Sequence, residues 1–309
     1  MKSFRGSVLG NKMIDTHCHI NDELYKNNPE EYIRIAKENG VDKFLVVGFD
    51  LASSKLAVEI AEKYPDCYAA IGVHPSDVKK EINQNIDELK NMAKSKKVIA
   101  IGEIGLDYYW DKEESIKSQQ KEYFIKQIEL ANELDLPISI HCRDAIEDCL
   151  NILKNHKVNR GGIMHCYSGS VESAREFIKL NFLLGVGGTV TFKNSINPKK
   201  VAAEIPPTSY VLETDAPYLT PHPYRGKENH SKYLFLVRDQ INQDYMDLAN
   251  NLMNADAGKK IPKMVGNLII AIYEFEIENT AESMFLITLD EQVSVSNMNV
   301  RYKASRREL

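Results

Sequence analysis

Short apolar runs recur along the chain, and between them apolar residues repeat at helical spacing. Ile86, Leu89 and Ala93 follow one another at intervals that place them on one face of a helix. Pro29 and Gly40 mark the start and the end of another predicted helix. Eight apolar runs have the length and composition of strands. These predicted strands cover residues 12–17, 43–49, 67–73, 97–105, 136–142, 161–166, 182–188 and 209–215.

The alternation of strands and helices predicts a parallel sheet, since parallel neighbours need a long crossover connection. Strands that are apolar almost throughout fit a sheet covered on both faces. Eight strand and helix units favour an α/β fold of the closed (β/α)8 TIM barrel type, and 309 residues suffice for one such domain. The alternative is an open doubly wound sheet. It is disfavoured because the first strand leads into histidines, where such a sheet would carry a glycine-rich phosphate turn.

The domain boundaries follow from where this pattern starts and stops. Residues 1–12 precede the first strand and form an N-terminal extension, and the barrel domain is expected over residues 13–286. The pattern breaks after the eighth strand, so residues 242–266 are a candidate insertion. The tail at 287–309 has partial two-residue alternation, which indicates an extra strand or a disordered end.

The first strand ends in MIDTHCHIND, with two histidines one residue apart. Because side chains alternate across a strand, His17 and His19 share one face and Cys18 points to the other. Two imidazoles on one face suit two ligands to one ion, although the pair alone is weak evidence and a structural role is the better reading of it. The same alternation predicts that Cys18, Cys142 and Cys166 face the helices and only pack there, which argues against a thiolate mechanism.

Four other predicted strands carry a histidine or a carboxylate near their C-terminal end. In a barrel these ends meet at one mouth, so residues far apart in sequence become neighbours. Four imidazoles and two carboxylates exceed the need of one tetrahedral ion and predict two divalent ions with one bridging carboxylate. Such ligands suit Zn²⁺, Mn²⁺ and, less well, Mg²⁺. The six candidate metal ligands are His17, His19, Glu103, His141, His165 and Asp215.

Composition and charge restrict the class of protein, its cellular compartment and the way in which it could bind nucleic acid. A chain with 43% hydrophobic and 27% charged residues is typical of soluble globular proteins. It has no apolar run of about 18 residues and no secretory signal pattern, and its five cysteines lack CxxC spacing, so we expect a cytoplasmic protein with reduced thiols. A net charge of −5 argues against a broad basic surface for nucleic acid and leaves room for a local contact.

Motif by motif, residues 14–229 resemble the TatD family of metal-dependent hydrolases. The motifs are, in order, IDTHCHI, GVHP, GEIGLDYYW, HCRDA, HCYSGS and ETDAPYLTP through PYRGKEN. The resemblance implies a TIM barrel and a divalent-metal-dependent deoxyribonuclease, typically a 3'-to-5' exonuclease on single-stranded or damaged DNA. The family's closing helix has only a distant counterpart, at 278–285. The resemblance further implies that one metal is bound by His17, His19 and Asp215, the other by His141 and His165, and that Glu103 bridges them.

Six residues are candidates for binding the substrate. Arg143 should return to the mouth side of its strand, where a guanidinium can hold a phosphate. Arg225 and Asn229 follow the eighth strand and are similar candidates, with a structural ion pair or a loop cap as the alternative. His74 matches a family histidine near the substrate. Tyr108 and the next tyrosine are candidates for stacking on a base, with simple packing as the alternative.

Asp215 and Glu103 are the candidate catalytic residues. Asp215 is the better general base, because a bridging Glu103 has its lone pairs engaged. Two bound cations would also supply the local positive potential that the formal charge lacks. Two alternatives remain open. One is an amidohydrolase-type enzyme for a small ester, amide or phosphoester, although many of those bridge their metals with a carboxylated lysine. The other is a non-catalytic binding protein, which retention of all six ligands disfavours.

Overall fold

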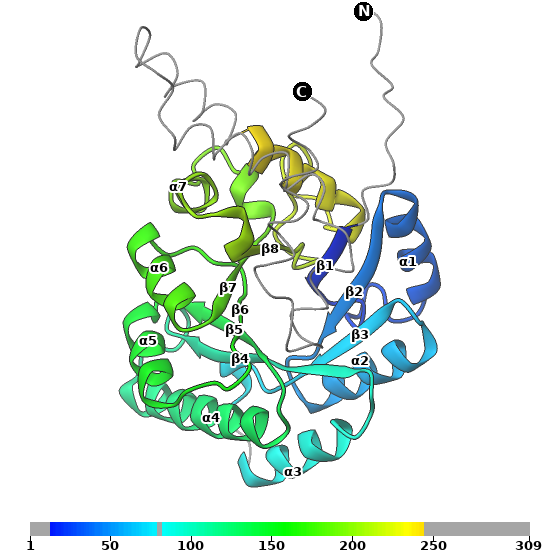
Figure 1. Ribbon diagram of the computed structural model, residues 1–309. Coiled ribbons are helices and arrows are strands. Elements are labelled where there is room, and N and C mark those ends of the chain that lie inside the picture. The colour runs from blue at the N-terminus through cyan, green and yellow to red at the C-terminus, as the bar shows by residue number, and fades with distance from the viewer. Residues whose placement is uncertain (1–12, 79–81, 244–309) are drawn as a thin grey trace, which may run out of the picture.

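The computed structural model describes residues 13–78 and 82–243, which form a (β/α)8 barrel (Figure 1). Eight parallel strands pair in chain order, and the helices lie outside the ring of strands. The predicted barrel and all eight predicted strands are confirmed. The strands are β1 (Met13–Cys18), β2 (Val41–Val47), β3 (Cys67–Ile71), β4 (Val98–Asp107), β5 (Ile138–Arg143), β6 (Gly162–Met164), β7 (Phe182–Val186) and β8 (Tyr210–Leu212).

The helices begin and end where the sequence carries boundary residues. In the first of them the Asn28 side chain accepts the N–H of Glu31, Pro29 occupies the first turn, and Gly40 follows the helix with a left-handed φ of 87°. The α-helices are α1 (Pro29–Glu38), α2 (Leu51–Lys63), α3 (Ile82–Met92), α4 (Glu114–Glu133), α5 (Ile146–Asn155), α6 (Val171–Lys179) and α7 (Asn197–Glu204). Residues 13–78 and 82–243 also contain four short 3-10 helices, which are η1 (Pro75–Asp77), η2 (Gly188–Thr191), η3 (Pro207–Ser209) and η4 (Ser231–Tyr233).

Both faces of the sheet are packed, as strand β2 illustrates. Phe44 and Val46 are fully buried in the large core that the strands share with the surrounding helices. Leu45 and Val47 point the other way and pack with alanines of β3 and β4 in a separate small cluster on the face toward the barrel axis. The inside of the barrel is therefore filled by small and aliphatic side chains at this level, and the polar residues gather at the mouth.

Strands β1 and β8 close the barrel at the level of the two histidines. The Asp215 N–H donates to His17 O at 2.9 Å, and the His19 N–H donates to Ala216 O at 2.8 Å. A parallel bridge also joins Cys18 to Ala216. This closure sets the backbone of the first two candidate ligands directly against that of the last one.

Asp15, which has no role in the sequence analysis, holds this closure together. Its fully buried carboxylate accepts hydrogen bonds from the backbone N–H and hydroxyl of Thr214, at 3.0 and 2.6 Å, and from the Ser231 hydroxyl at 2.6 Å. Burial raises the pKa of the Asp15 carboxyl to about 6, although the hydrogen bonds from Ser231 and Thr214 act to lower it. Asp15 is thus a structural residue that ties β1 to the segment after β8.

Several sequence predictions lie outside the described residues. These are the extension at 1–12, almost all of the candidate insertion at 242–266, the distant closing-helix motif at 278–285 and the tail at 287–309. Residues 234–243 are helical. In the part of the chain that the structure describes, we find no helix with the length and apolar character needed to cross a membrane.

Candidate metal centre

Strand β1 presents two imidazoles to the barrel mouth. His17 and His19 are buried, and Cys18 points the opposite way, where its thiol lies 3.4 Å from Leu45 O. The predicted alternation is therefore confirmed. His19 Nδ1 lies 2.9 Å from Val47 O, and because a carbonyl only accepts, Nδ1 carries the proton. When the ring is neutral, its lone pair is on Nε2, which faces Asp215 Oδ1 at 3.3 Å; when the ring is protonated, Nε2 donates a hydrogen bond to that oxygen.

His17 has two fully buried ring nitrogens, and neither makes a hydrogen bond within the described part of the chain. Its Nε2 lies 3.6 Å from Glu103 Oε2 and 3.8 Å from Asp215 Oδ1. Unpaired buried polar atoms are costly, so this arrangement calls for a missing partner. Two atoms bound to one ion at about 2.1 Å lie at most about 4.2 Å apart, and both separations satisfy that limit. The residues therefore fit a divalent ion.

His165 follows β6 and lies between carboxylates. Its Nε2 is 3.6 Å from Asp215 Oδ1 and 3.9 Å from Glu103 Oε1, and its Nδ1 is 3.1 Å from Glu213 Oε1. Burial acts to lower the pKa of His165, but the negative charges of Glu213 and Asp215 outweigh it and raise the pKa to about 10. Without a metal the ring is a cation, and a bound metal would displace its proton.

Glu213 was missed by the sequence analysis. It is fully buried and accepts the Cys166 N–H at 2.6 Å besides facing His165. A Cβ at Gly185 would lie 2.3 Å from Glu213 Oε2, so only glycine leaves room for this carboxylate. A carboxylate behind a ligating histidine orients the ring and raises its basicity. The signal in the sequence was its position two residues before Asp215, in the polar run directly after β8.

We expect Glu213→Gln to weaken metal binding by about 10- to 100-fold, since the amide keeps the volume but loses the charge that holds His165. Calorimetric titration of the metal-free protein with Mn²⁺ measures the change. Glu204→Gln is the matched control, because Glu204 is an exposed glutamate on α7 whose nearest cation, Arg175, lies 4.0 Å away. Equal Mn²⁺ affinity of the two variants would show that Glu213 does not act on the metal site.

His141, at the end of β5, is held between two carboxylates. Its Nδ1 lies 2.9 Å from Glu103 Oε1 and its Nε2 lies 2.9 Å from Asp107 Oδ2. Burial acts to lower the pKa of His141, but the hydrogen bonds to Asp107 and Glu103 raise it to about 9. In this arrangement the ring is an imidazolium, so a ligand role for His141 requires that a metal replace one of its protons. Asp107, also missed by the sequence analysis, lies four residues after Glu103 on β4.

Glu103 is the centre of the cluster. Burial acts to raise its pKa, but the surrounding imidazoles, with His74, His141 and His17 foremost, hold the pKa well below its usual range. The carboxylate is therefore ionised and approached from several sides, as a bridging ligand would be. Gly105, two residues on, has a φ of 138°, and a Cβ there would meet His141 O at 2.0 Å. This glycine lets β4 approach β5 closely beside the site.

His74 lies at the mouth as predicted, but its ring is set differently from those of the ligands. Its Nδ1 accepts the Ser76 N–H at 3.1 Å, so in the neutral ring the proton is on Nε2. That Nε2 is 3.8 Å from Glu103 Oε1. Burial lowers the pKa of His74 to about 4, although the charge of Glu103 opposes this. A neutral ring with an N–H directed into the site suits donation to a substrate oxygen, which fits its predicted role.

Of the three cysteines next to candidate ligands, two behave as predicted. Cys18 packs in the core and Cys142 packs partly buried against it. The prediction for Cys166 is wrong, because β6 ends at Met164 and Cys166 has a left-handed φ of 46°. Strand alternation therefore does not extend to Cys166. Its sulfur comes close to His165 and Glu213, within a set of potential ligand atoms, and burial raises the pKa of the thiol well above its usual value.

Two predicted substrate residues are exposed at the mouth. The Arg143 guanidinium lies over the Tyr109 ring, 3.7 Å from its centroid, and the Arg225 guanidinium lies over Phe192 at 3.9 Å. Arg225 also donates to Thr220 O at 3.2 Å. A guanidinium stacked flat on a ring leaves N–H groups at its edge for an anion.

The other two predicted substrate contacts are corrected. The Tyr108 hydroxyl donates to Asp148 of α5 at 2.8 Å and the ring packs against the core, so Tyr108 is directed to the helix layer. Asn229 is fully buried, and its amide donates to Thr214 O and Tyr218 O at 2.8 and 2.6 Å. Both side chains are engaged within the protein, as the packing and capping alternatives expect.

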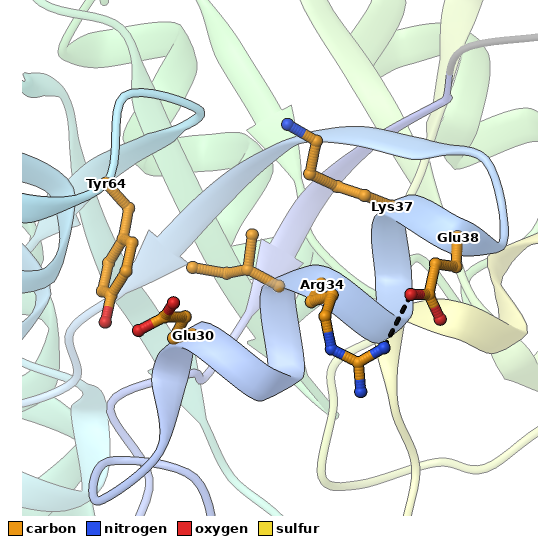
Figure 2. A pocket seen from close by; sticks show the side chains of 6 residues that line it. Glu30, Arg34, Lys37, Glu38 and Tyr64 are labelled. Carbon is orange, nitrogen blue, oxygen red and sulfur yellow. Dashed lines mark hydrogen bonds and ion pairs between the residues drawn. The ribbon is translucent and has the colours of Figure 1, made fainter.

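The structure brings all six predicted ligands to one place. Among the described residues, potential ligand atoms lying within 4.8 Å of one another occur in four groups: His17, Glu103 and His165; His17, His19 and Asp215; His74, Asp107 and His141; and His165, Cys166 and Glu213. Elsewhere, a hollow of about 490 Å³ lies on the outside of the barrel along α1 (Figure 2). Arg34, which lines this hollow, is already paired with Glu38 at 2.6 Å. None of the residues that line the hollow belongs to the four groups of potential ligands.

A TIM barrel with imidazoles and carboxylates gathered at its mouth defines the class of metal-dependent barrel hydrolases. The model of the family described as TatD related DNase matches residues 14–253. A Bacillus subtilis (strain 168) protein, the uncharacterized metal-dependent hydrolase YabD, is 50% identical over 230 residues, which are 74% of this chain and 89% of that protein. The chain belongs to the TatD family of metal-dependent hydrolases.

Solved structures agree with this assignment. The crystal structure of YJJV, a TatD homolog from Escherichia coli K12, superposes with a TM-score of 0.73 at 28% identity and covers 87% of this chain and 97% of that one. An uncharacterized amidohydrolase from Saccharomyces cerevisiae superposes with a TM-score of 0.65 at 20% identity, covering 87% of this chain and 99% of that one. The second likeness supports the fold.

Proposed function

We propose that this protein is a deoxyribonuclease that hydrolyses DNA phosphodiester bonds with divalent metal, as a 3'-to-5' exonuclease preferring single-stranded ends. The observation that carries the proposal is the buried, unpaired His17, whose Nε2 faces Glu103 and Asp215 at distances that suit a shared ion. The match to a family described as TatD related DNase supports the choice of substrate.

The proposal assigns a place to each of the six ligands. His17, His19 and Asp215 would hold one ion, and their ligand atoms already lie within 4.8 Å of one another. Bound divalent ions supply Lewis acidity toward a phosphoryl oxygen and make a water acidic at neutral pH. The remaining ligands, His141 and His165, would hold a second ion, with Glu103 between the two.

Asp215 is the proposed general base. Burial acts to raise its pKa, but the charge of His165 and the hydrogen bond from His19 lower it, so the carboxylate is ionised at neutral pH. Its side chain remains 15% exposed, which leaves a path for a water to reach it. Asp215 can therefore accept the proton of the attacking water, while the Nε2–H of His74 donates to a substrate oxygen.

Arg143 favours a phosphodiester over a small neutral ester or amide. Within residues 13–78 and 82–243, no carboxylate forms an ion pair with its guanidinium, which lies on Tyr109 with its edge free. It projects from the end of β5, two residues after His141. A free guanidinium beside a metal cluster suits the charge of a phosphate, and a planar fork can bind two of its oxygens.

The test compares single-stranded DNA, double-stranded DNA, RNA, and a small ester and amide, each with Mg²⁺ and with Mn²⁺. We expect 5'-labelled single-stranded DNA to shorten progressively from its 3' end, and we expect EDTA to stop the reaction. Activity undiminished by EDTA would refute the metal mechanism. Hydrolysis of only the small ester or amide would establish the amidohydrolase alternative instead.

A further inference from the structure

Among the described residues, the exposed large hydrophobic side chains lie at one end of the molecule. Within residues 13–78 and 82–243, five large hydrophobic side chains are exposed, and each lies in a loop that follows a strand, on the same end as the metal cluster. Single exposed apolar residues are unremarkable, but their restriction to the rim of a polar cluster points to a ligand. The five are Leu24, Tyr109, Trp110, Ile196 and Tyr218.

Tyr109 and Trp110 are neighbours in the loop between β4 and α4. Their ring centroids are 4.6 Å apart with an interplanar angle of 89°, and Trp110 is 70% exposed. One face of Tyr109 is covered by the Arg143 guanidinium, which lies 5.8 Å from the Trp110 centroid. Because Trp110 meets Tyr109 at right angles and is mostly exposed, it offers ring surface to solvent beside an arginine.

The Asp107 carboxylate connects the backbone of these two residues to the metal cluster. Asp107 Oδ1 accepts the backbone N–H of Tyr109 at 2.9 Å and of Trp110 at 3.5 Å, while its Oδ2 lies 2.9 Å from His141 Nε2. The aromatic loop and a candidate metal ligand are therefore held by the same side chain. The backbone that carries Trp110 is thus anchored to a side chain of the cluster.

We infer that Trp110, Tyr109 and Arg143 form a nucleobase subsite, in which an unpaired base stacks on Trp110 and the edge of the Arg143 guanidinium contacts the adjoining phosphate. The inference rests on the proposed nuclease function and gives a physical reason for its preference for single strands, because a paired base must first break its hydrogen bonds to the partner strand before it can move onto a ring in a loop. Stacking is tolerant of sequence, since every base has a π face.

Trp110 is the only tryptophan of the chain, so its fluorescence reports on this subsite alone. In the test, a short single-stranded DNA is titrated into the full-length protein in the presence of Mg²⁺, with which its phosphorothioate linkages resist cleavage. A second strand of equal length carries abasic units throughout. We expect the base-bearing strand to quench Trp110 emission and the abasic strand to leave it nearly unchanged. Labelled strands measure binding independently by anisotropy.

Variants separate stacking from general binding. Trp110→Ala should weaken binding of the base-bearing strand about ten-fold, and Trp110→Phe should restore most of that loss. The Trp110→Ala variant and the unchanged protein should bind the abasic strand with equal affinity. Ile196→Ala is the matched control, because Ile196 is 66% exposed on another loop of the same rim but has no ring. It should bind the base-bearing strand as the unchanged protein does.

Several results would overturn the inference. One is equal quenching by both strands, and another is a Trp110→Ala variant that binds the base-bearing strand with full affinity. Emission that shifts with protein concentration and not with DNA would assign the rim to a contact between copies. Quenching without cleavage of an ordinary DNA strand would leave the subsite standing and refute the nuclease proposal. Cleavage of ordinary DNA together with a Trp110→Ala variant of unchanged DNA affinity would support the nuclease proposal and refute the subsite.

Discussion

Glu103→Gln is expected to lower the rate of metal-dependent hydrolysis by roughly a thousand-fold or more, beyond the 10- to 100-fold typical of residues that only orient a ligand. Glutamine keeps the volume but removes the negative charge at the centre of the cluster. It also has an NH₂ group in place of one carboxylate oxygen, and an amide nitrogen does not bind a metal at neutral pH. Initial rates on the best substrate of the panel, together with bound metal per chain by atomic emission, measure the effect.

The control for this substitution is Glu38→Gln, which removes a carboxylate that pairs with Arg34 on the exposed face of α1. It should keep the full rate and the full metal content. A Glu103→Gln protein that retains both would show that the buried carboxylate is structural. In that case a bridging role would have to be abandoned.

Asp215→Asn is expected to reduce kcat by about 100- to 10,000-fold, the usual contribution of a positioned general base. The asparagine can still offer an oxygen to a metal but cannot accept the proton of the attacking water at neutral pH. KM should change much less than kcat, because proton transfer belongs to the chemical step. Steady-state kinetics combined with metal analysis separate the two roles of Asp215.

Retention of metal with loss of kcat would identify Asp215 as the base, whereas loss of both would make it chiefly a ligand. Asp239→Asn serves as the control, since Asp239 is an exposed aspartate paired with Arg238 far along the chain from the cluster. A kcat of the Asp215→Asn protein within a few-fold of the unchanged protein would exclude the base assignment.

The gathering of the six candidate ligands was predictable because it depends on two regular features. Side chains repeat with a period of two along a strand, which placed His17 and His19 on one face. Parallel strands of a barrel all end at one mouth, which brought Glu103 and His165 to the same place as Asp215. Both features hold whatever the details of packing, so they can be applied to a sequence without coordinates.

The errors occurred where regular backbone ends. Tyr108 stands one residue past β4, and its orientation toward α5 depends on a hydrogen bond to Asp148, forty positions away. Asn229 lies in a long loop, and its burial depends on carbonyls of two other segments. Cys166 follows β6 in a left-handed conformation, to which strand alternation does not apply.

By itself the sequence determined the barrel, the end at which the candidate ligands lie and the six side chains that gather there, because these follow from local periodicity and chain order. Only the tertiary structure decided which ring nitrogens are free, that Glu213 and Asp107 stand behind His165 and His141, and that Trp110 rather than Tyr108 is exposed beside Arg143. The reason is physical. Tautomers, pKa values and exposure depend on distances of a few ångströms between residues remote in sequence, and only packing sets those distances.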